Sequence, residues 1–216
     1  MTQSSAPNRG QLITFEGIDG AGKSTHIEPA AERLRRHGVT VQVTREPGGT
    51  ALADALRQWL LHEDMSARTE ALLAFAARAD HVERRIAPAL AAGDWVLCDR
   101  FSDSTIAYQG GGRGLGVAAI EALEHWTLAD FAPDRTYLFD LDPAEAARRR
   151  GRVREADRFE SEAVEFFERV REAYRARVAR TPRRFVCLDA MQSPEVIANE
   201  IAADLDRFVG LAPSRA

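Results

Sequence analysis

The sequence has almost no lysine. Lys23 is the single lysine among 29 basic residues, and all the others are arginines. A compact ammonium and a planar guanidinium are not interchangeable where a tight loop leaves room for only one of them. Chance is the plain alternative, but the pattern favours a constraint at position 23.

Cysteine and long apolar runs are scarce too, and each absence excludes a class of protein. Cys98 and Cys187 lie in short apolar runs and are expected to be buried small hydrophobes, without a disulfide framework. The five histidines show no ligand spacing with them, so no zinc site is expected. No stretch approaches the roughly 18 apolar residues of a membrane span, and residues 1–10 are too polar for a signal peptide. We therefore expect a cytoplasmic protein without a membrane partner.

The net charge is −4 at neutral pH and is unevenly distributed. A sequence-independent nucleic-acid binder usually carries a basic surplus, so no nucleic-acid partner is expected. Residues 148–158, however, contain six arginines and two acidic residues. A small basic segment on an acidic body suits a small polyanion.

The remaining pattern predicts one α/β domain over residues 11–210, between disordered tails at 1–10 and 211–216. Strand-like runs alternate with helical patterns, which is typical of a five-stranded parallel sheet with helices on both faces. The strands are expected at 11–16, 39–44, 95–99, 135–141 and 184–188. Ligands of such sheets bind beyond the carboxyl ends of the strands.

Several helix boundaries can be predicted from capping residues. A first helix is expected over about 22–37, ending at Gly38, and another over 69–86. Asp142 followed by Pro143 indicates an N-cap with proline at the first helical position, and Glu145 would complete a capping box. Ser193 followed by Pro194 indicates the start of the last helix.

Residues 17–24 match the phosphate-binding pattern G-x-x-x-x-G-K-[ST], between an expected strand and an expected helix. Its glycines let backbone N–H groups point at phosphate oxygens, and the helix N-terminus adds positive charge. Lys23 is expected to bridge the β- and γ-phosphates, and Ser24 to bind Mg²⁺. The expected ATP-binding set is Gly17, Ile18, Asp19, Gly20, Ala21, Gly22, Lys23, Ser24 and Thr25.

This loop indicates a nucleotide without fixing the reaction. A GTPase would need a guanine-reading N-K-x-D, and neither Asn8 nor Asn199 begins one. An ATPase motor usually ends a strand in Asp-Glu, whereas Asp99 is followed here by Arg100. An arginine in place of a water-activating base favours a kinase with a second anion site.

Three further segments accompany the phosphate loop: TREPGGT at 44–50, DRFSDSTIAYQGGGR at 99–113 and the arginine-rich stretch 148–158. With FEGIDG at 15–20, they strongly resemble the bacterial thymidylate kinase family, from about Gln11 to Phe208. The resemblance implies a P-loop nucleoside monophosphate kinase fold with a mobile lid at about 148–160. It also implies transfer of the γ-phosphoryl of ATP to dTMP with Mg²⁺, in dTTP biosynthesis, by a homodimer.

The resemblance assigns roles to acceptor-side residues. Arg45 and Arg100 would bind the acceptor phosphate, and Asp19 would lie near the sugar 3′-hydroxyl and orient the phosphates. Phe75 would stack on thymine, with core packing as its alternative. The rest of the expected substrate-binding set is Arg78 at a base carbonyl, Thr105 at the base edge, Tyr108 against the sugar C2′, and Gln109.

The lid and the metal site are the least determined. With no arginine at Gly20-Ala21-Gly22, the family pattern puts catalytic arginines in the lid, and Arg149 and Arg154 are the expected pair. The arginine spacing around Gly151 fits that pattern only with a one-residue ambiguity. Asp99 is expected to contact Mg²⁺ through water, with a structural hydrogen bond as the alternative. Two alternative functions stay open: another nucleoside monophosphate kinase, and a non-enzymatic ATP-binding module.

Overall fold

The computed structural model describes residues 9–150, 158–159 and 162–211. The expected tails therefore lie mostly outside the described residues. Arg9 and Gly10 are within them, and the Gly10 N–H donates a 2.8 Å hydrogen bond to the Leu90 carbonyl. The packed chain thus begins earlier than the expected boundary at residue 11.

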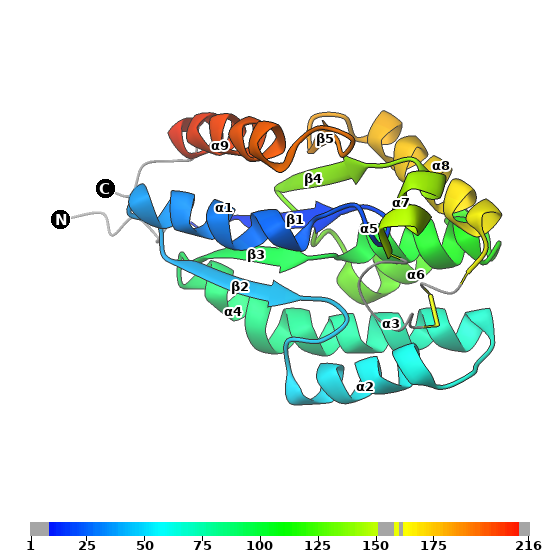
Figure 1. Cartoon of the computed structure of the whole chain (residues 1–216). Helices are drawn as coiled ribbons and strands as arrows, with labels where there is room; N and C mark the ends of the chain where they lie inside the picture. The colour runs from blue at the N-terminus through cyan, green and yellow to red at the C-terminus, as the bar shows by residue number, and fades with distance from the viewer. Residues whose placement is uncertain (1–8, 151–157, 160–161, 212–216) are drawn as a thin grey trace.

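Five parallel strands form one sheet in the order β2-β3-β1-β4-β5 (Figure 1). They are β1 (Leu12–Glu16), β2 (Val41–Arg45), β3 (Trp95–Asp99), β4 (Arg135–Asp140) and β5 (Phe185–Asp189). The expected strands are confirmed, with ends displaced by no more than two residues. Arg45 pairs in register with Asp99, so the carboxyl ends of β2 and β3 lie together.

Helices cover both faces of the sheet, as expected (Figure 1). The α-helices are α1 (Ser24–Arg36), α2 (Ala51–His62), α3 (Ala67–His81), α4 (Ala87–Ala91), α5 (Ser102–Thr105), α6 (Val117–Leu128), α7 (Pro143–Arg150), α8 (Val164–Arg180) and α9 (Pro194–Leu211). Two π-helical segments, η1 (Val82–Ile86) and η2 (Ile106–Gly112), continue α3 and α5.

The expected caps are partly confirmed. Asp142 accepts a 3.0 Å hydrogen bond from the Ala144 N–H, and Ser193 accepts one of 3.4 Å from the Val196 N–H. The Glu145 carboxylate instead pairs with Arg148 and Arg149 at the end of α7. The Glu145 N–H donates to Asp142 at 3.4 Å, which is one half of the expected capping box, while arginines three and four residues away bind the glutamate side chain.

The strands bury both faces because alternate residues enter different cores. In β3, Trp95 and Leu97 join the large core formed with α1, α8 and α9. Val96 and Cys98 enter a second core with η1 and α4. The sheet is thereby fixed between two layers, and its carboxyl edge becomes a rigid base for loops.

One cysteine departs from expectation. Cys98 is buried in β3, but Cys187 is exposed. Its strand, β5, lies at the edge of the sheet, where only one side has a neighbouring strand. The apolar run around Cys187 suggests burial, yet the edge position leaves its thiol accessible.

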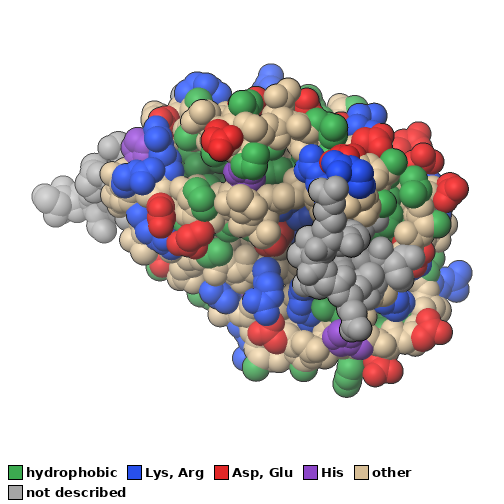
Figure 2. All heavy atoms as spheres, in the orientation of Figure 1, with side chains coloured by type: hydrophobic (Ala, Val, Ile, Leu, Met, Phe, Trp, Pro, Cys, Tyr) green, Lys and Arg blue, Asp and Glu red, His purple; other side chains and the backbone are tan. Residues whose placement is uncertain are grey.

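The described surface is mixed in charge. Acidic and basic side chains are interspersed over the face in Figure 2. No helix among the described residues is long and apolar enough to cross a membrane.

Candidate active site

The phosphate loop joins β1 to α1 and is shaped by its glycines. A Cβ on Gly17 would come within 2.6 Å of the Phe139 carbonyl oxygen, so only glycine fits there. Gly22 has open space around it but a φ of +90°, which side chains rarely adopt. The first turn of α1 contains no acidic residue, so its N-terminus keeps its positive potential.

Lys23 is folded back onto this loop. Its Nζ donates to the carbonyls of Gly17 (3.0 Å) and Ile18 (3.1 Å), and the side chain is almost fully buried. Burial, reinforced by the charge of Arg100, lowers the lysine pKa to about 8. The amine therefore rests between backbone carbonyls that approaching phosphates can replace. Ser24 and Thr25 are exposed at the start of α1.

Arg100 connects the phosphate loop to the segment after β3. Its guanidinium donates to the Gly17 carbonyl at 2.9 Å and to the Asp19 carboxylate at 2.5 Å. Tyr108 also donates to Asp19, at 2.9 Å. Burial alone would raise the pKa of Asp19, but the charges of Arg100 and Lys23 outweigh it and keep that pKa well below its ordinary value. Asp19 is thus a permanent anion between two cations.

The backbone of Arg100 is strained, with a φ of +68°. Glu16, the last residue of β1, stabilises this turn through hydrogen bonds. Its carboxylate accepts from the Phe101 N–H (2.7 Å), the Ser104 hydroxyl (2.6 Å) and the Tyr174 hydroxyl (2.8 Å). Ser104 in turn accepts from Arg100 at 3.1 Å. Sequence reasoning missed this role, and the available signal was a carboxylate ending an otherwise apolar strand.

A cavity of about 130 Å³ lies beside this junction. Six of the expected acceptor-side residues line it: Asp19, Arg78, Arg100, Thr105, Tyr108 and Gln109. Its other lining residues were not among the individually expected site residues and include Glu46, Pro47, Arg57, Leu60 and Phe159. The cavity is therefore polar and charged where it meets the phosphate loop, and α2 contributes Arg57 together with the apolar Leu60 and Leu61.

Arg45 and Phe75 lie beside the cavity and are not among its described lining residues. The Arg45 guanidinium is exposed and pairs with Asp54 at 3.2 Å. Phe75 is buried in a small core with Ala71 and Ile106, and the Arg78 guanidinium lies 4.9 Å from the centre of its ring. In this arrangement the Phe75 ring packs against the Arg78 guanidinium.

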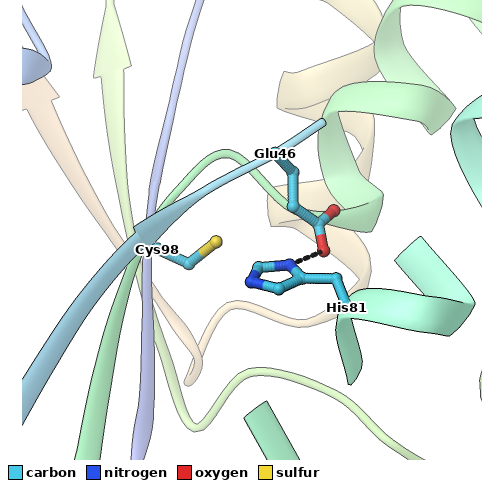
Figure 3. A group of neighbouring side chains, drawn as sticks. All are labelled: Glu46, His81 and Cys98. Carbon is cyan, nitrogen blue, oxygen red and sulfur yellow. Dashed lines mark hydrogen bonds and ion pairs between the residues drawn. The ribbon is translucent and has the colours of Figure 1, made fainter. Parts of the chain in front are cut away.

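A buried network fixes Arg78 and the loop after β2. Glu46 accepts from Arg78 (2.7 Å) and pairs with the Nδ1 of His81 (3.0 Å), whose Nε2 lies 2.8 Å from the Thr44 hydroxyl. Cys98 points toward the same imidazole (Figure 3). Glu46, His81 and Cys98 are metal-ligating types within 4.8 Å of one another. Because both ring nitrogens are engaged and Arg78 adds a positive charge, we interpret the group as structural.

The expected lid is partly described. Arg149 is half-buried and pairs with Glu145 at 2.8 Å, away from the cavity lining. Arg154 lies outside the described residues. Arg158 lies within them, and it donates to Glu70 at 2.7 Å and to the Leu60 carbonyl at 3.1 Å.

The donor set fits a magnesium ion. Mg²⁺ prefers oxygen ligands and keeps several waters. Asp99 Oδ1 is buried and has no hydrogen-bond partner within the described part of the chain, and Asp99 acts electrostatically on Lys23. An unpartnered buried carboxylate oxygen next to a phosphate loop is suited to a water of a hydrated cation.

A phosphate loop on this sheet, facing an arginine-bearing cavity across a single carboxylate, defines a P-loop nucleoside monophosphate kinase. A family model described as thymidylate kinase matches residues 15–201. The chain belongs to the thymidylate kinase family.

Curated relatives cover nearly the whole chain. A thymidylate kinase of Thiobacillus denitrificans is 55% identical over 193 residues, which are 89% of this chain and 95% of that protein. One from Cupriavidus metallidurans is 54% identical over 200 residues, 91% of this chain and 100% of that protein. One from Bordetella pertussis is 50% identical over 205 residues, 94% of this chain and 98% of that protein.

Proposed function

We propose that the chain is a dTMP kinase, an enzyme that phosphorylates dTMP to dTDP with ATP as the phosphoryl donor. One observation carries this proposal beyond family membership. Asp19 of the phosphate loop binds Arg100 at the edge of the cavity, so the donor and acceptor sites share one ion pair. The reacting phosphates would meet there.

The chemistry requires charge compensation more than proton transfer. The acceptor phosphate is already an anion at neutral pH, so no general base is needed. Repulsion between two polyanions and charge on the transferring group make up the barrier. Lys23 would leave the carbonyls of Gly17 and Ile18 to bind the β- and γ-phosphates, while Arg100 would bind the acceptor phosphate. Arg149 and Arg154 are the proposed lid arginines.

Ser24 and, through water, Asp99 would hold Mg²⁺, which when bound neutralises phosphate charge. Arg78, fixed by Glu46, would bind a carbonyl of the base, and Thr105 and Gln109 would face the base edge. Arg45 would approach the acceptor phosphate only if its pair with Asp54 opened. Phe75, whose buried ring lies 4.9 Å from the Arg78 guanidinium, would stack on the base, with core packing as the alternative.

Two further properties are proposals drawn from the family. We expect a homodimer, because Leu72 on α3 and Trp126 on α6 are exposed apolar side chains on two helices that pack together. Light scattering on the purified protein tests this, and a monomer at micromolar concentration would refute it. We also expect the protein to work in the cytoplasm beside its nucleotide substrates, which fractionation would check.

The deciding experiment is a coupled assay of ADP release with ATP, Mg²⁺ and a panel of acceptors: dTMP, dUMP, CMP and UMP. We expect dTMP to give the highest kcat/KM, with dTDP as the product. Preference for CMP or UMP would indicate another nucleoside monophosphate kinase. ATP binding without ADP release on addition of dTMP would indicate a non-enzymatic module.

A further inference from the structure

Glu70 is a buried carboxylate with three donors and no role in the proposed reaction so far. It lies near the start of α3, and its side chain is fully shielded from solvent. It accepts from Gln109 at 2.6 Å, from Arg158 at 2.7 Å and from Arg113 at 3.3 Å. These donors come from segments 39, 88 and 43 residues away in the chain. A buried carboxylate is tolerated only when it is bonded in this way.

Two of these contacts lead directly to the cavity. Gln109 lines it, and so does Phe159, the neighbour of Arg158. The guanidiniums of Arg158 and Arg113 lie 4.9 and 5.6 Å from the centre of the Phe159 ring. That ring meets Tyr108 edge-on, with the ring centres 6.1 Å apart. Glu70 therefore anchors two parts of the cavity wall, Gln109 and Phe159, that lie far apart in the sequence.

The hydrogen bond between Gln109 and Glu70 determines which end of the Gln109 amide faces Glu70. An ionised carboxylate only accepts hydrogen bonds, so the amide nitrogen of Gln109 must face Glu70. Its carbonyl oxygen occupies the other branch of the planar amide. A pyrimidine with N–H at ring position 3, such as thymine or uracil, can donate to a carbonyl. Cytosine carries a lone pair at that position and cannot donate a hydrogen bond from it.

We propose that Glu70 is a positioning residue for base selection. It orients the Gln109 amide so that the amide carbonyl faces the cavity. Through Arg158, it also holds Phe159 in place as the opposite wall of the cavity. The inference rests on the proposed function, because it names how the same acceptor site distinguishes bases. Glu70 itself touches no substrate. Its effect is transmitted through Gln109 and through the Arg158–Phe159 pair.

The test is steady-state kinetics of Glu70→Gln with dTMP, dCMP and ATP varied in turn. A carboxamide at position 70 accepts or donates, so it no longer dictates the orientation of Gln109. We expect the KM for dTMP to rise about tenfold and the dTMP-over-dCMP ratio of kcat/KM to fall about tenfold. The KM for ATP should stay within about twofold, since the phosphate loop makes no contact with Glu70 among the described residues.

Glu162→Gln is the matched control. Glu162 pairs with Arg113 but with neither Gln109 nor Arg158 among the contacts described, so base selection should be unchanged. Gln109→Met removes the amide with similar shape, and adding Glu70→Gln to it should cause no further loss of selectivity. If Glu70→Gln fails to fold, Gln109→Met alone decides, and unchanged selectivity in it overturns the inference.

Equal losses for dTMP and ATP in Glu70→Gln would show a merely structural role and also overturn it. The wild-type protein shows whether a negative result concerns the proposed function or only the role of Glu70. Without dTDP from the wild type, the proposed function fails. With dTDP from the wild type and an unchanged dTMP-over-dCMP ratio in Glu70→Gln, only the role of Glu70 fails.

Discussion

Lys23 and Arg100 carry the positive charge closest to the junction of the two sites. Replacing either by alanine should lower kcat by at least about 100-fold, the usual cost of losing one charge-stabilising donor. Turnover from ADP release measures this, and circular dichroism checks folding. Arg84, whose side chain is 73% exposed and pairs with Asp80 alone in the described contacts, is the matched control. Near-normal turnover in Lys23→Ala or Arg100→Ala would contradict the assigned roles.

Two substitutions at Tyr108 distinguish the role of its ring from the role of its hydroxyl. Its ring packs among Phe159, Phe166 and Phe167, and its hydroxyl binds Asp19. Tyr108→Phe should keep the preference for deoxyribose over ribose, because the ring is what would crowd a 2′-hydroxyl. Tyr108→Ala should relax that preference, measured as the dUMP-over-UMP ratio of kcat/KM. An unchanged ratio in Tyr108→Ala would remove Tyr108 from the sugar site.

The role of a single residue could be predicted where a local sequence motif contains the signal. It could not be predicted where the role depends on a partner distant in the sequence. The phosphate loop and Arg100 could be assigned from short patterns and the family resemblance. The roles of Glu16, Glu46 and Glu70 could not, although the first two lie inside quoted motifs, because each role depends on contacts more than 30 residues away. A buried carboxylate looks like any other glutamate until its donors are placed around it.

Among the elements, η2 shows how glycines set the distance between layers. A Cβ on Gly112 would lie 2.5 Å from Phe166 Cε2 and 2.8 Å from Val170 Cγ2, both on α8. Gly112→Ala should therefore lower the free energy of unfolding by about 1–3 kcal/mol through overpacking. Urea denaturation measures this.

Gly210→Ala in α9 provides the control, because its Cβ would meet nothing within 4 Å. It should leave stability unchanged or raise it slightly, since alanine favours helix. An equal loss of stability in both variants would contradict the packing argument for Gly112.

Hydrophobic periodicity located the strands well and the π-helical segments poorly. The run 69–86 reads as one helix, and the chain indeed continues through it, but its hydrogen bonding changes at Val82. Such a change adds one residue to a turn and leaves little trace in the apolar pattern. The position of β5 at the sheet edge, which exposes Cys187, likewise depends on strand order and not on local sequence.

At the scale of the whole molecule, Glu16 should couple stability to pH. Burial, with the nearby charge of Asp103, raises its pKa from 4.5 to about 7, despite opposing hydrogen bonds from Ser104 and Tyr174 and the charge of Arg100. The folded state therefore binds a proton that the unfolded state has already released. The contribution of Glu16 to stability should fall as pH rises from about 4.5 to about 7, and level off above that.

Glu16→Gln lacks this titration, so the comparison isolates it. Urea unfolding of both proteins at about pH 5, 6, 7 and 8 should show the stability of Glu16→Gln rising relative to wild type up to about pH 7. A difference that stays constant across this range would mean that Glu16 titrates normally in the fold.

The near-absence of lysine has a practical consequence at the same scale. Lys23 offers the chain's single side-chain amine, and a pKa of about 8 leaves much of it neutral at mildly alkaline pH, unlike an ordinary lysine. An amine-selective acylating reagent would therefore find one side-chain amine, located in the nucleotide loop. The extent of that labelling, read by mass spectrometry with and without ATP, would report occupancy of the loop directly, with no engineered probe.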